Sequence, residues 1–249
     1  MSDSQGASDA TKRRDLEHDG PPILVATDLA PSAADALLAG RARSILTGAA
    51  LIVCHVMPDD SLRYAPLMPH QHHVLADDVQ ALAAGQSLRA QVRACTALPD
   101  HAYRLHLERG VPSNAILHLA DTLGAGLIIV GHGSESMVTR ALLGSTTEDL
   151  ARRAPMSLLV VRPGRPYGPI VATLALDGTA SRAGRAATRE AAMRGAKVVT
   201  VLDEDPVEIA ATVLASLIIV DGSRDDDDPV EMLRRARCSM LILRGPHEV

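Results

Sequence analysis

Five short apolar runs, separated by alanine-rich stretches of helical length, dominate the first two thirds of this chain. Most of the runs are continuous rather than alternating, which is typical of strands covered on both faces. The stretches between them, Ser32–Leu46, Asp77–Ala97 and Ser113–Leu123, predict helices. This alternation predicts an α/β fold with an open parallel sheet. The predicted strands are Ile23–Thr27, Leu51–Val56, Tyr103–Leu107, Leu127–Val130 and Leu158–Val161.

A segment rich in proline and glycine interrupts this pattern. Arg162–Pro169 holds three prolines and two glycines, which continue neither a helix nor a central strand. We therefore predict a linker at 163–169. Shorter apolar runs follow it and predict four further strands. These runs are Ile170–Leu176, Val198–Leu202, Leu217–Val220 and Met240–Leu243.

The second set of runs repeats the first. The letters LIIV at Leu127–Val130 return at Leu217–Val220, and Arg152–Ser157 is matched by Arg234–Ser239. A repeat of this kind implies one fold used twice. Residues 204–216, between the second run and LIIV, leave this copy room for one helix and no third strand. We predict two tandem domains, at 21–162 and 170–249, the second truncated.

Composition narrows the range of partners. The chain has 249 residues, no Phe or Trp and three Tyr, which leaves few side chains for stacking on bases. Its formal net charge of −5 gives no basic footprint for nucleic acid or anionic lipid. The three cysteines form no CxxC pair, which favours reduced thiols in the cytoplasm. Residues 1–20 are polar and predict a disordered tail without the apolar core of a signal peptide. No apolar run is long enough for a bilayer.

The strongest chemical signal is the segment Gly131–Thr147, which directly follows a predicted strand. Ligands of open α/β sheets bind at that carboxyl end. Ser145 and Glu148 have the spacing of a capping box, and the N-terminus of the helix they begin would present free N–H groups to an anion. The segment lacks a Walker lysine. An ordinary βα loop with a capped helix has the same spacing, so the residues alone leave both interpretations open.

Asp28, His132 and a histidine cluster are weaker signals. Asp28 ends the first strand and would face the same edge of the sheet, where it would bind a nucleoside or a metal ion, or would serve as a turn residue before Pro31. His132 lies in the predicted phosphate loop and would contact phosphate when protonated. No nearby Cys or carboxylate completes a convincing metal site with the cluster His70, His72 and His73, so we predict none. Leu62–Leu75, which contains this cluster, predicts a mobile flap.

An acidic segment in the second domain argues against a second phosphate site. Asp177 aligns with Asp28, but the segment Asp221–Pro229 replaces the glycine loop. Five aspartates in that segment would repel phosphate. We therefore predict that the second domain binds no nucleotide.

At this point the residues resemble a known family. The segments ILVATDLAPSAADAL, GAALIVCHV, ERGVPSNAILHLA and LIIVGHGSES…LLGSTTEDLARRAPMSLLVVR resemble a universal stress protein domain in order and length. The resemblance covers Pro22–Arg162 well and Pro169–Arg244 weakly. It implies two adenine-nucleotide-hydrolase-like, Rossmann-like domains and ATP as ligand, with or without Mg²⁺. Gly126 departs from the family, which usually has Asp there.

The family's Gly-x-x-Gly-x9-Gly-Ser/Thr motif is matched with one departure. Gly131 takes the first position, Gly144 the third and Ser145 the hydroxyl position, whereas Ser134 stands at the second glycine. Gly133 fits that position only with ten residues before Gly144. The resemblance implies that Asp28 and the backbone of Val56 contact the nucleoside. It implies a phosphate cradle made by Gly131, Gly133, Ser134, Gly144, Ser145 and Thr146.

The resemblance predicts a regulatory or protective nucleotide-binding module of the stress response rather than a fast enzyme. Two alternatives stay open. The first is a weak ATP hydrolase with Asp28, Glu135 or His132 as its base, and the second is an interaction scaffold that binds no nucleotide. Family members pair through edge strands, which a tandem chain would satisfy internally. A homodimer and a regulatory protein partner are compatible with the same resemblance.

Overall fold

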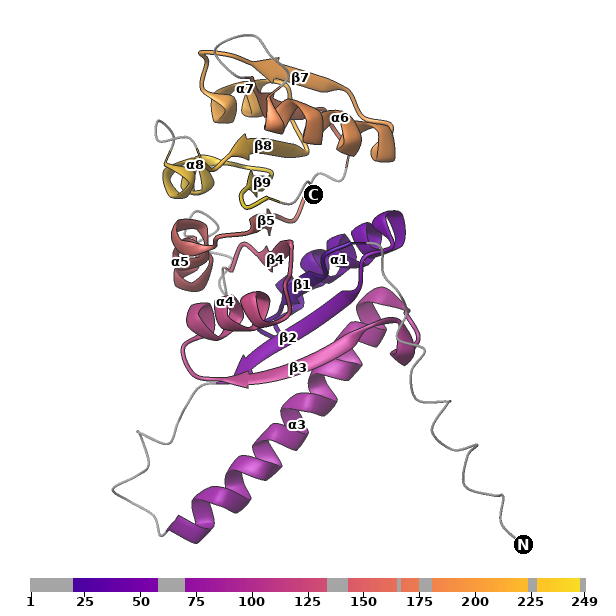
Figure 1. Cartoon of the computed structure of the whole chain (residues 1–249), viewed down its shortest axis with the longest axis vertical. Coiled ribbons are helices and arrows are strands. Elements are labelled where there is room, and N and C mark those ends of the chain that lie inside the picture. Colours follow the sequence, from indigo (N-terminus) through magenta and orange to yellow (C-terminus); the bar gives the residue numbers. More distant parts are fainter. Residues whose placement is uncertain are drawn as a thin grey trace, which may run out of the picture.

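The computed structural model describes residues 20–57, 70–133, 143–164, 167–174, 181–223 and 228–246, and for residues 70–77 only the backbone. Nine strands form one sheet in the order β3-β2-β1-β4-β5-β9-β8-β6-β7 (Figure 1). The α/β fold with a mostly parallel sheet is therefore confirmed. The strands are β1 (Ile23–Ala26), β2 (Leu51–Met57), β3 (Arg104–Arg109), β4 (Leu127–Gly131), β5 (Ser157–Val161), β6 (Ile170–Thr173), β7 (Val198–Val201), β8 (Leu217–Asp221) and β9 (Ser239–Leu243).

Helices cover both faces of this sheet, as the continuous apolar runs predict. One core cluster joins the sheet to α1, α3 and α6, and the other joins it to α4, α5, α7 and α8. Neighbouring residues of one strand serve opposite faces: Leu24 belongs to one cluster and Val25 to the other. The helices are α1 (Ala34–Thr47), α3 (His70–Thr96), α4 (Pro112–Thr122), α5 (Ser145–Arg153), α6 (Arg182–Arg194), α7 (Pro206–Thr212) and α8 (Pro229–Arg235), with short 3-10 turns η1 (Pro31–Ala33) and η2 (Asp100–Ala102).

The strand order repeats with inverted direction along the sheet. The first five strands are parallel in the order β3-β2-β1-β4-β5, and the last four are parallel in the order β9-β8-β6-β7. Only α7 connects β7 to β8, and every residue of that connection is described, so the second set has no equivalent of β3. The domain boundaries at 162 and 170 remain predictions, as does the tail at 1–20, of which only Gly20 is described.

The helix α3 differs from its prediction. It begins at His70 rather than at Asp77, because no proline or glycine interrupts the chain between these residues. The backbone of His70, His72 and His73 is therefore helical, and the flap predicted at Leu62–Leu75 is wrong for its last six residues. The rest of that flap, residues 62–69, lies outside the described residues, as do the side chains of the histidine cluster.

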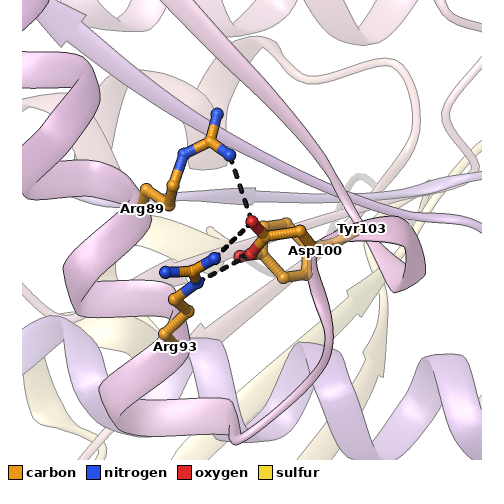
Figure 2. A network of polar contacts seen from close by, with 4 residues as sticks. All are labelled: Arg89, Arg93, Asp100 and Tyr103. Atoms are coloured by element: carbon orange, nitrogen blue, oxygen red, sulfur yellow. Dashed lines mark hydrogen bonds and ion pairs between the residues drawn. The ribbon is translucent and has the colours of Figure 1, made fainter.

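A polar network fixes the carboxyl-terminal end of α3 to the edge of the sheet (Figure 2). Arg93 binds the Asp100 carboxylate through Nε at 2.8 Å and Nη2 at 2.5 Å, and Arg89 adds a contact of 3.2 Å. The Tyr103 hydroxyl donates to the same carboxylate at 2.8 Å. These hydrogen bonds, above all those from Arg93, hold the pKa of Asp100 below its usual range. The network anchors the long helix where β3 begins.

The two sets of strands join at an antiparallel seam between β5 and β9. Leu159 pairs with Leu241 at its centre. The backbone N–H of Arg162 donates to the Ser239 hydroxyl and that of Arg244 to the Ser157 hydroxyl, each at 3.1 Å. These four residues are the matched positions of the internal repeat. The two copies of the repeat therefore pair with each other across the seam about a local two-fold axis.

The arginine side chains at the seam repeat this relation. The Arg162 guanidinium donates to the Leu233 carbonyl at 2.6 Å, next to the end of α8. The Arg244 guanidinium donates to the Ala154 carbonyl at 3.0 Å, at the end of α5. Each half thus supplies an arginine to the carboxyl end of a helix in the other half, where exposed carbonyls and the helix dipole favour a cation.

A buried ion pair joins the halves on the opposite face. Arg43 of α1 lies 2.5 Å from Glu190 of α6, and the exposed fractions of the two side chains are 6% and 4%. Arg194 holds the other carboxylate oxygen at 2.9 Å. The Nε and Nη2 atoms of Arg43 have no hydrogen-bond partner in the part of the chain that is described. The charge of Glu190 therefore compensates a guanidinium that burial has desolvated.

We predict that Glu190→Gln lowers the free energy of unfolding by about 3 kcal/mol, because it leaves the buried Arg43 cation without a counter-charge. Urea unfolding of the whole chain measures this change. The control is Glu208→Gln, which removes a carboxylate whose side chain is 76% exposed and 3.7 Å from Arg235. That control should cost less than about 1 kcal/mol. Equal, small losses in both variants would contradict the prediction.

Candidate functional site

One cavity of about 650 Å³ opens at the carboxyl ends of β1, β2 and β4. This is where an open parallel sheet places its ligands, between strands whose connections leave on opposite faces. The structure brings seven of the eight predicted site residues to its wall, and Ser134 lies outside the described residues. The seven are Asp28, Val56, Gly131, Gly133, Gly144, Ser145 and Thr146. The other described residues that line it are Ala26, Thr27, Ser32, Ala33, His55, Pro112, Ile116, Val130 and Thr147.

Two glycines pack against each other at one end of the cavity. Gly133 has φ +75°, and a Cβ placed on Gly144 would lie 3.0 Å from the Gly133 carbonyl oxygen. The Gly144 N–H donates to the His132 carbonyl at 3.3 Å. The positive φ favours glycine at 133, and close backbone approach favours it at 144. Gly131 differs, because its Cβ would make only ordinary contacts, the nearest at 3.7 Å to the Ser32 carbonyl oxygen.

The helix α5 begins at this pair of glycines, but not through the predicted capping box. Gly144 is the N-cap, Ser145 is already helical, and no side chain caps the first turn. The Glu148 carboxylate binds Arg152 at 2.5 Å and Arg234 of α8 at 2.7 Å. The capping box is therefore wrong, because two guanidinium groups offer this carboxylate charge-assisted hydrogen bonds that a backbone N–H does not match.

The first turn of α5 consequently faces the cavity with its amides open. No acceptor in the described ranges takes the N–H groups of Ser145, Thr146 or Thr147. The Thr147 hydroxyl instead donates to the Gly131 carbonyl at 3.2 Å and ties the helix to the end of β4. A helix start with unpaired amides and a positive dipole end favours an anion.

Asp28 serves the turn role considered for it and also lies at the cavity. Its Oδ1 accepts the N–H of Ala30 at 2.9 Å, which is the turn role, and the side chain is exposed at the cavity. Leu29 between them has φ +66°, and its N–H donates to the Thr27 hydroxyl at 3.0 Å. The turn thereby holds a carboxylate at the end of β1 with one oxygen still available to a ligand.

His132 is not on the cavity wall. Its side chain is buried, and its Nε2 has no hydrogen-bond partner among the residues described. Burial, with a smaller effect of the nearby Arg162 cation, lowers the pKa of His132 to about 4. The imidazole is therefore neutral at neutral pH, and the expectation of a protonated His132 against phosphate is wrong. Of the three bases considered for hydrolysis, only Asp28 lines the cavity, and Glu135 lies outside the described residues.

The charge on the wall is sparse. Asp28 is the single carboxylate among the described lining residues, and these include no Lys or Arg. Recognition of an anion by these lining residues would therefore depend on backbone amides and hydroxyl groups.

Two other features are absent from the described residues. No three His, Cys, Asp or Glu residues gather there as a metal-binding group. No described helix has the length and apolarity to cross a bilayer.

The second half has no equivalent of the glycine pair among its described residues. Asp221 stands where Gly131 stands in the first half, and its Oδ1 accepts the Ser223 N–H at 3.1 Å. A Cβ on the next residue, Gly222, would lie 2.5 Å from Ile242 and 2.9 Å from Arg244. The Arg244 side chain therefore packs directly against the backbone of Gly222. Asp177 and residues 224–227 lie outside the described residues.

Comparison with known proteins agrees with this geometry. A model of the universal stress protein family matches residues 21–162, more than half of the chain, and the chain belongs to that family. Universal stress protein E of Escherichia coli strain K12 is 32% identical over 65 residues, which are 26% of this chain and 21% of that relative. The match thus spans about a fifth of the length of this curated relative.

Solved structures resemble both halves in fold. A universal stress protein from Archaeoglobus fulgidus DSM 4304 has a TM-score of 0.62 at 13% identity, covering 90% of this chain and 98% of its own. PA1789 from Pseudomonas aeruginosa PAO1, described as functionally unknown, has a TM-score of 0.59 at 14% identity, covering 92% and 94%. At these identities the likeness concerns the fold alone, and it extends well beyond residue 162.

The pKa of His132 gives a prediction for the dependence of stability on pH. The folded chain holds His132 neutral down to about pH 4, whereas the unfolded chain protonates it near its ordinary value of 6.5. Between these values the unfolded state binds more protons, so stability that is fully present above 6.5 is lost as the pH falls toward 4. The wild type should lose about 2–3 kcal/mol more than His132→Gln over this range.

Urea unfolding of both proteins at neutral pH and near pH 4 measures this difference. The exposed His101 supplies the matched control, because His101→Gln removes a histidine without removing a buried one. His101→Gln should follow the wild type. An identical pH dependence in the wild type and in His132→Gln would contradict the prediction.

Proposed function

We propose that this chain is an adenine-nucleotide-binding regulatory or protective module of the stress response, and that it holds ATP in the cavity at the ends of β1, β2 and β4. One observation carries the proposal. Seven residues predicted from three separate sequence segments line a single cavity, and a close pair of glycines leads there into a helix start with open amides. Family membership supports the same conclusion.

The phosphates would lie against Gly133, Gly144 and the first turn of α5. The amides of Ser145 and Thr146 and their hydroxyl groups supply donors, and the helix dipole adds partial positive charge. Because the described wall has no Lys or Arg, we propose that Mg²⁺ accompanies the polyphosphate and neutralises part of its charge. The free oxygen of Asp28 is of the type that Mg²⁺ prefers. The contribution of Ser134 belongs to this proposal and lies outside the described residues.

The nucleoside would occupy the other end of the cavity. Ala26, Val130 and Ile116 supply apolar surface for a purine ring there. Asp28 accepts a hydrogen bond from the nucleoside, and Val56 presents its backbone. A cavity of about 650 Å³ lies in the range of ordinary small-molecule sites.

The organisation of the chain belongs to the same proposal. We propose tandem domains at 21–162 and 170–249, in which the seam of β5 with β9 takes the place of pairing between two separate chains. The mirrored strand order supports this. A cytoplasmic location, a regulatory protein partner and a homodimer formed through other surfaces complete the proposed setting.

We predict that ATP with Mg²⁺ binds one site per chain, and that Gly144→Asp weakens binding by at least about 2 kcal/mol, roughly thirtyfold. The added side chain would approach the Gly133 carbonyl oxygen and place a negative charge beside the phosphates. Isothermal titration calorimetry with and without Mg²⁺ measures both quantities. The comparison of titrations with and without Mg²⁺ separately tests whether the ion neutralises part of the polyphosphate charge.

The matched control for Gly144→Asp is Gly20→Asp, because a Cβ on Gly20 meets nothing within 4 Å. It adds the same charge away from the cavity and should leave ATP binding unchanged. Circular dichroism establishes that both variants fold. No heat at millimolar ATP in the wild type would overturn the proposal and would favour an interaction scaffold.

A further inference from the structure

His55 lies on the wall of the cavity. It is half-buried on β2, next to Val56. In the sheet, β1 stands between β2 and β4. Two strand spacings, about 10 Å, therefore separate His55 from the end of β4, where the glycine pair begins. His55 belongs to the end of the cavity proposed for the nucleoside.

The position of one ring proton follows from a backbone contact. The Nδ1 of His55 lies 2.8 Å from the Thr27 carbonyl oxygen. A carbonyl oxygen only accepts hydrogen bonds, so Nδ1 carries the proton and donates. In the neutral ring, Nε2 is then an acceptor. The contact selects the tautomer of His55 and leaves its acceptor nitrogen for another group.

Thr27 is itself held in place. Its hydroxyl donates to the Gln91 side chain at 2.7 Å, and the Gln91 amide donates to the Ala30 carbonyl at 2.9 Å. Thr27 is buried, with 6% of its surface exposed. This network extends from α3 to the turn after β1 and fixes the carbonyl that orients the His55 ring.

His55 and Asp28, both on the cavity wall, have the same hydrogen-bonding character. The Nε2 of His55 has no partner in the described part of the chain, and the second oxygen of Asp28 likewise accepts and does not donate. Asp28 follows β1 and His55 lies near the end of β2, so the two acceptors come from adjacent parallel strands. A ligand that satisfies both must present hydrogen-bond donors.

We propose that His55 is a specificity-determining residue of the nucleotide site. Its Nε2 accepts a hydrogen bond from an O–H or N–H donor on the nucleoside, which is either a ribose hydroxyl or the exocyclic amine of the base. This inference rests on the proposed function and adds a requirement to it: nucleotides that lack this donor bind more weakly. A site built to pair a donor discriminates against the analogue without it, because the buried acceptor is left unpaired.

Four nucleotides and three variants test the inference by calorimetry. The nucleotides are ATP, 2′-deoxy-ATP, 3′-deoxy-ATP and purine riboside triphosphate, which lacks the amine. His55→Phe removes both ring nitrogens. His55→Asn keeps a donor in the place of Nδ1 for the Thr27 carbonyl but has no atom in the place of Nε2. His118→Phe changes an exposed histidine of α4 that is not among the residues lining the cavity, and it serves as the control.

We expect His55→Phe and His55→Asn to weaken ATP binding roughly tenfold each, and His118→Phe to leave it unchanged. One of the three analogues should bind the wild type roughly tenfold more weakly than ATP and should lose nothing further in His55→Asn. That analogue identifies the donor as a particular ribose hydroxyl or as the amine. A purely structural role for His55 would not produce this selective loss.

Four results would overturn the inference. Unchanged ATP affinity in His55→Asn, with a loss in His55→Phe, would make His55 only a support for Thr27. An equal loss for all four nucleotides in His55→Asn would exclude a hydrogen bond to any of the three varied groups. A wild type that binds none of the nucleotides would overturn the proposed function together with this inference, whereas binding that is unaffected in every variant would overturn the inference alone.

Discussion

The antiparallel pairing of β5 with β9 is the interaction on which the rest of the structure depends. It converts two parallel arrangements into one sheet of nine strands. Without it, β5 and β9 would each be an edge strand with a row of unpaired backbone groups. The hydroxyls of Ser157 and Ser239 extend the pairing at both ends by accepting the next backbone N–H across the seam.

The seam also reaches the candidate site, because α5 serves both. The first turn of α5 lines the cavity, while Glu148 one residue later binds Arg234 of the second half at 2.7 Å. The Arg244 guanidinium holds the far end of the same helix through the Ala154 carbonyl. The helix whose open amides face the cavity is thus fixed at two points by the other half of the chain. Preorganised donors of this kind bind an anion without the cost of ordering them first.

The sequence predicts those features that depend on local patterns. Short apolar runs, most of them continuous, predict all nine strands to within a few residues, and the glycines at 133 and 144 stand where the backbone approaches itself. The sequence does not predict features that depend on residues far apart along the chain. Glu148 has the spacing of a capping box, but Arg234 lies 86 residues away and binds its carboxylate instead. The contact between His55 and the Thr27 carbonyl joins two strands and follows from their register, which no spacing reveals.

A comparison of the two halves separates the residues of the seam from those of the site. The second half keeps its serine and arginine at the seam, Ser239 and Arg244. Each serine hydroxyl accepts the backbone N–H of the other half's arginine, and each guanidinium donates to a carbonyl near the end of a helix in the other half. At the cavity it differs, because Asp221 replaces Gly131 and the Arg244 side chain crowds the position after it. The two sets of residues therefore differ in what the second half retains, although they lie on neighbouring strands. Pairing across the seam needs only backbone geometry and two hydroxyls, whereas a phosphate site needs glycines that nothing else in the second half requires.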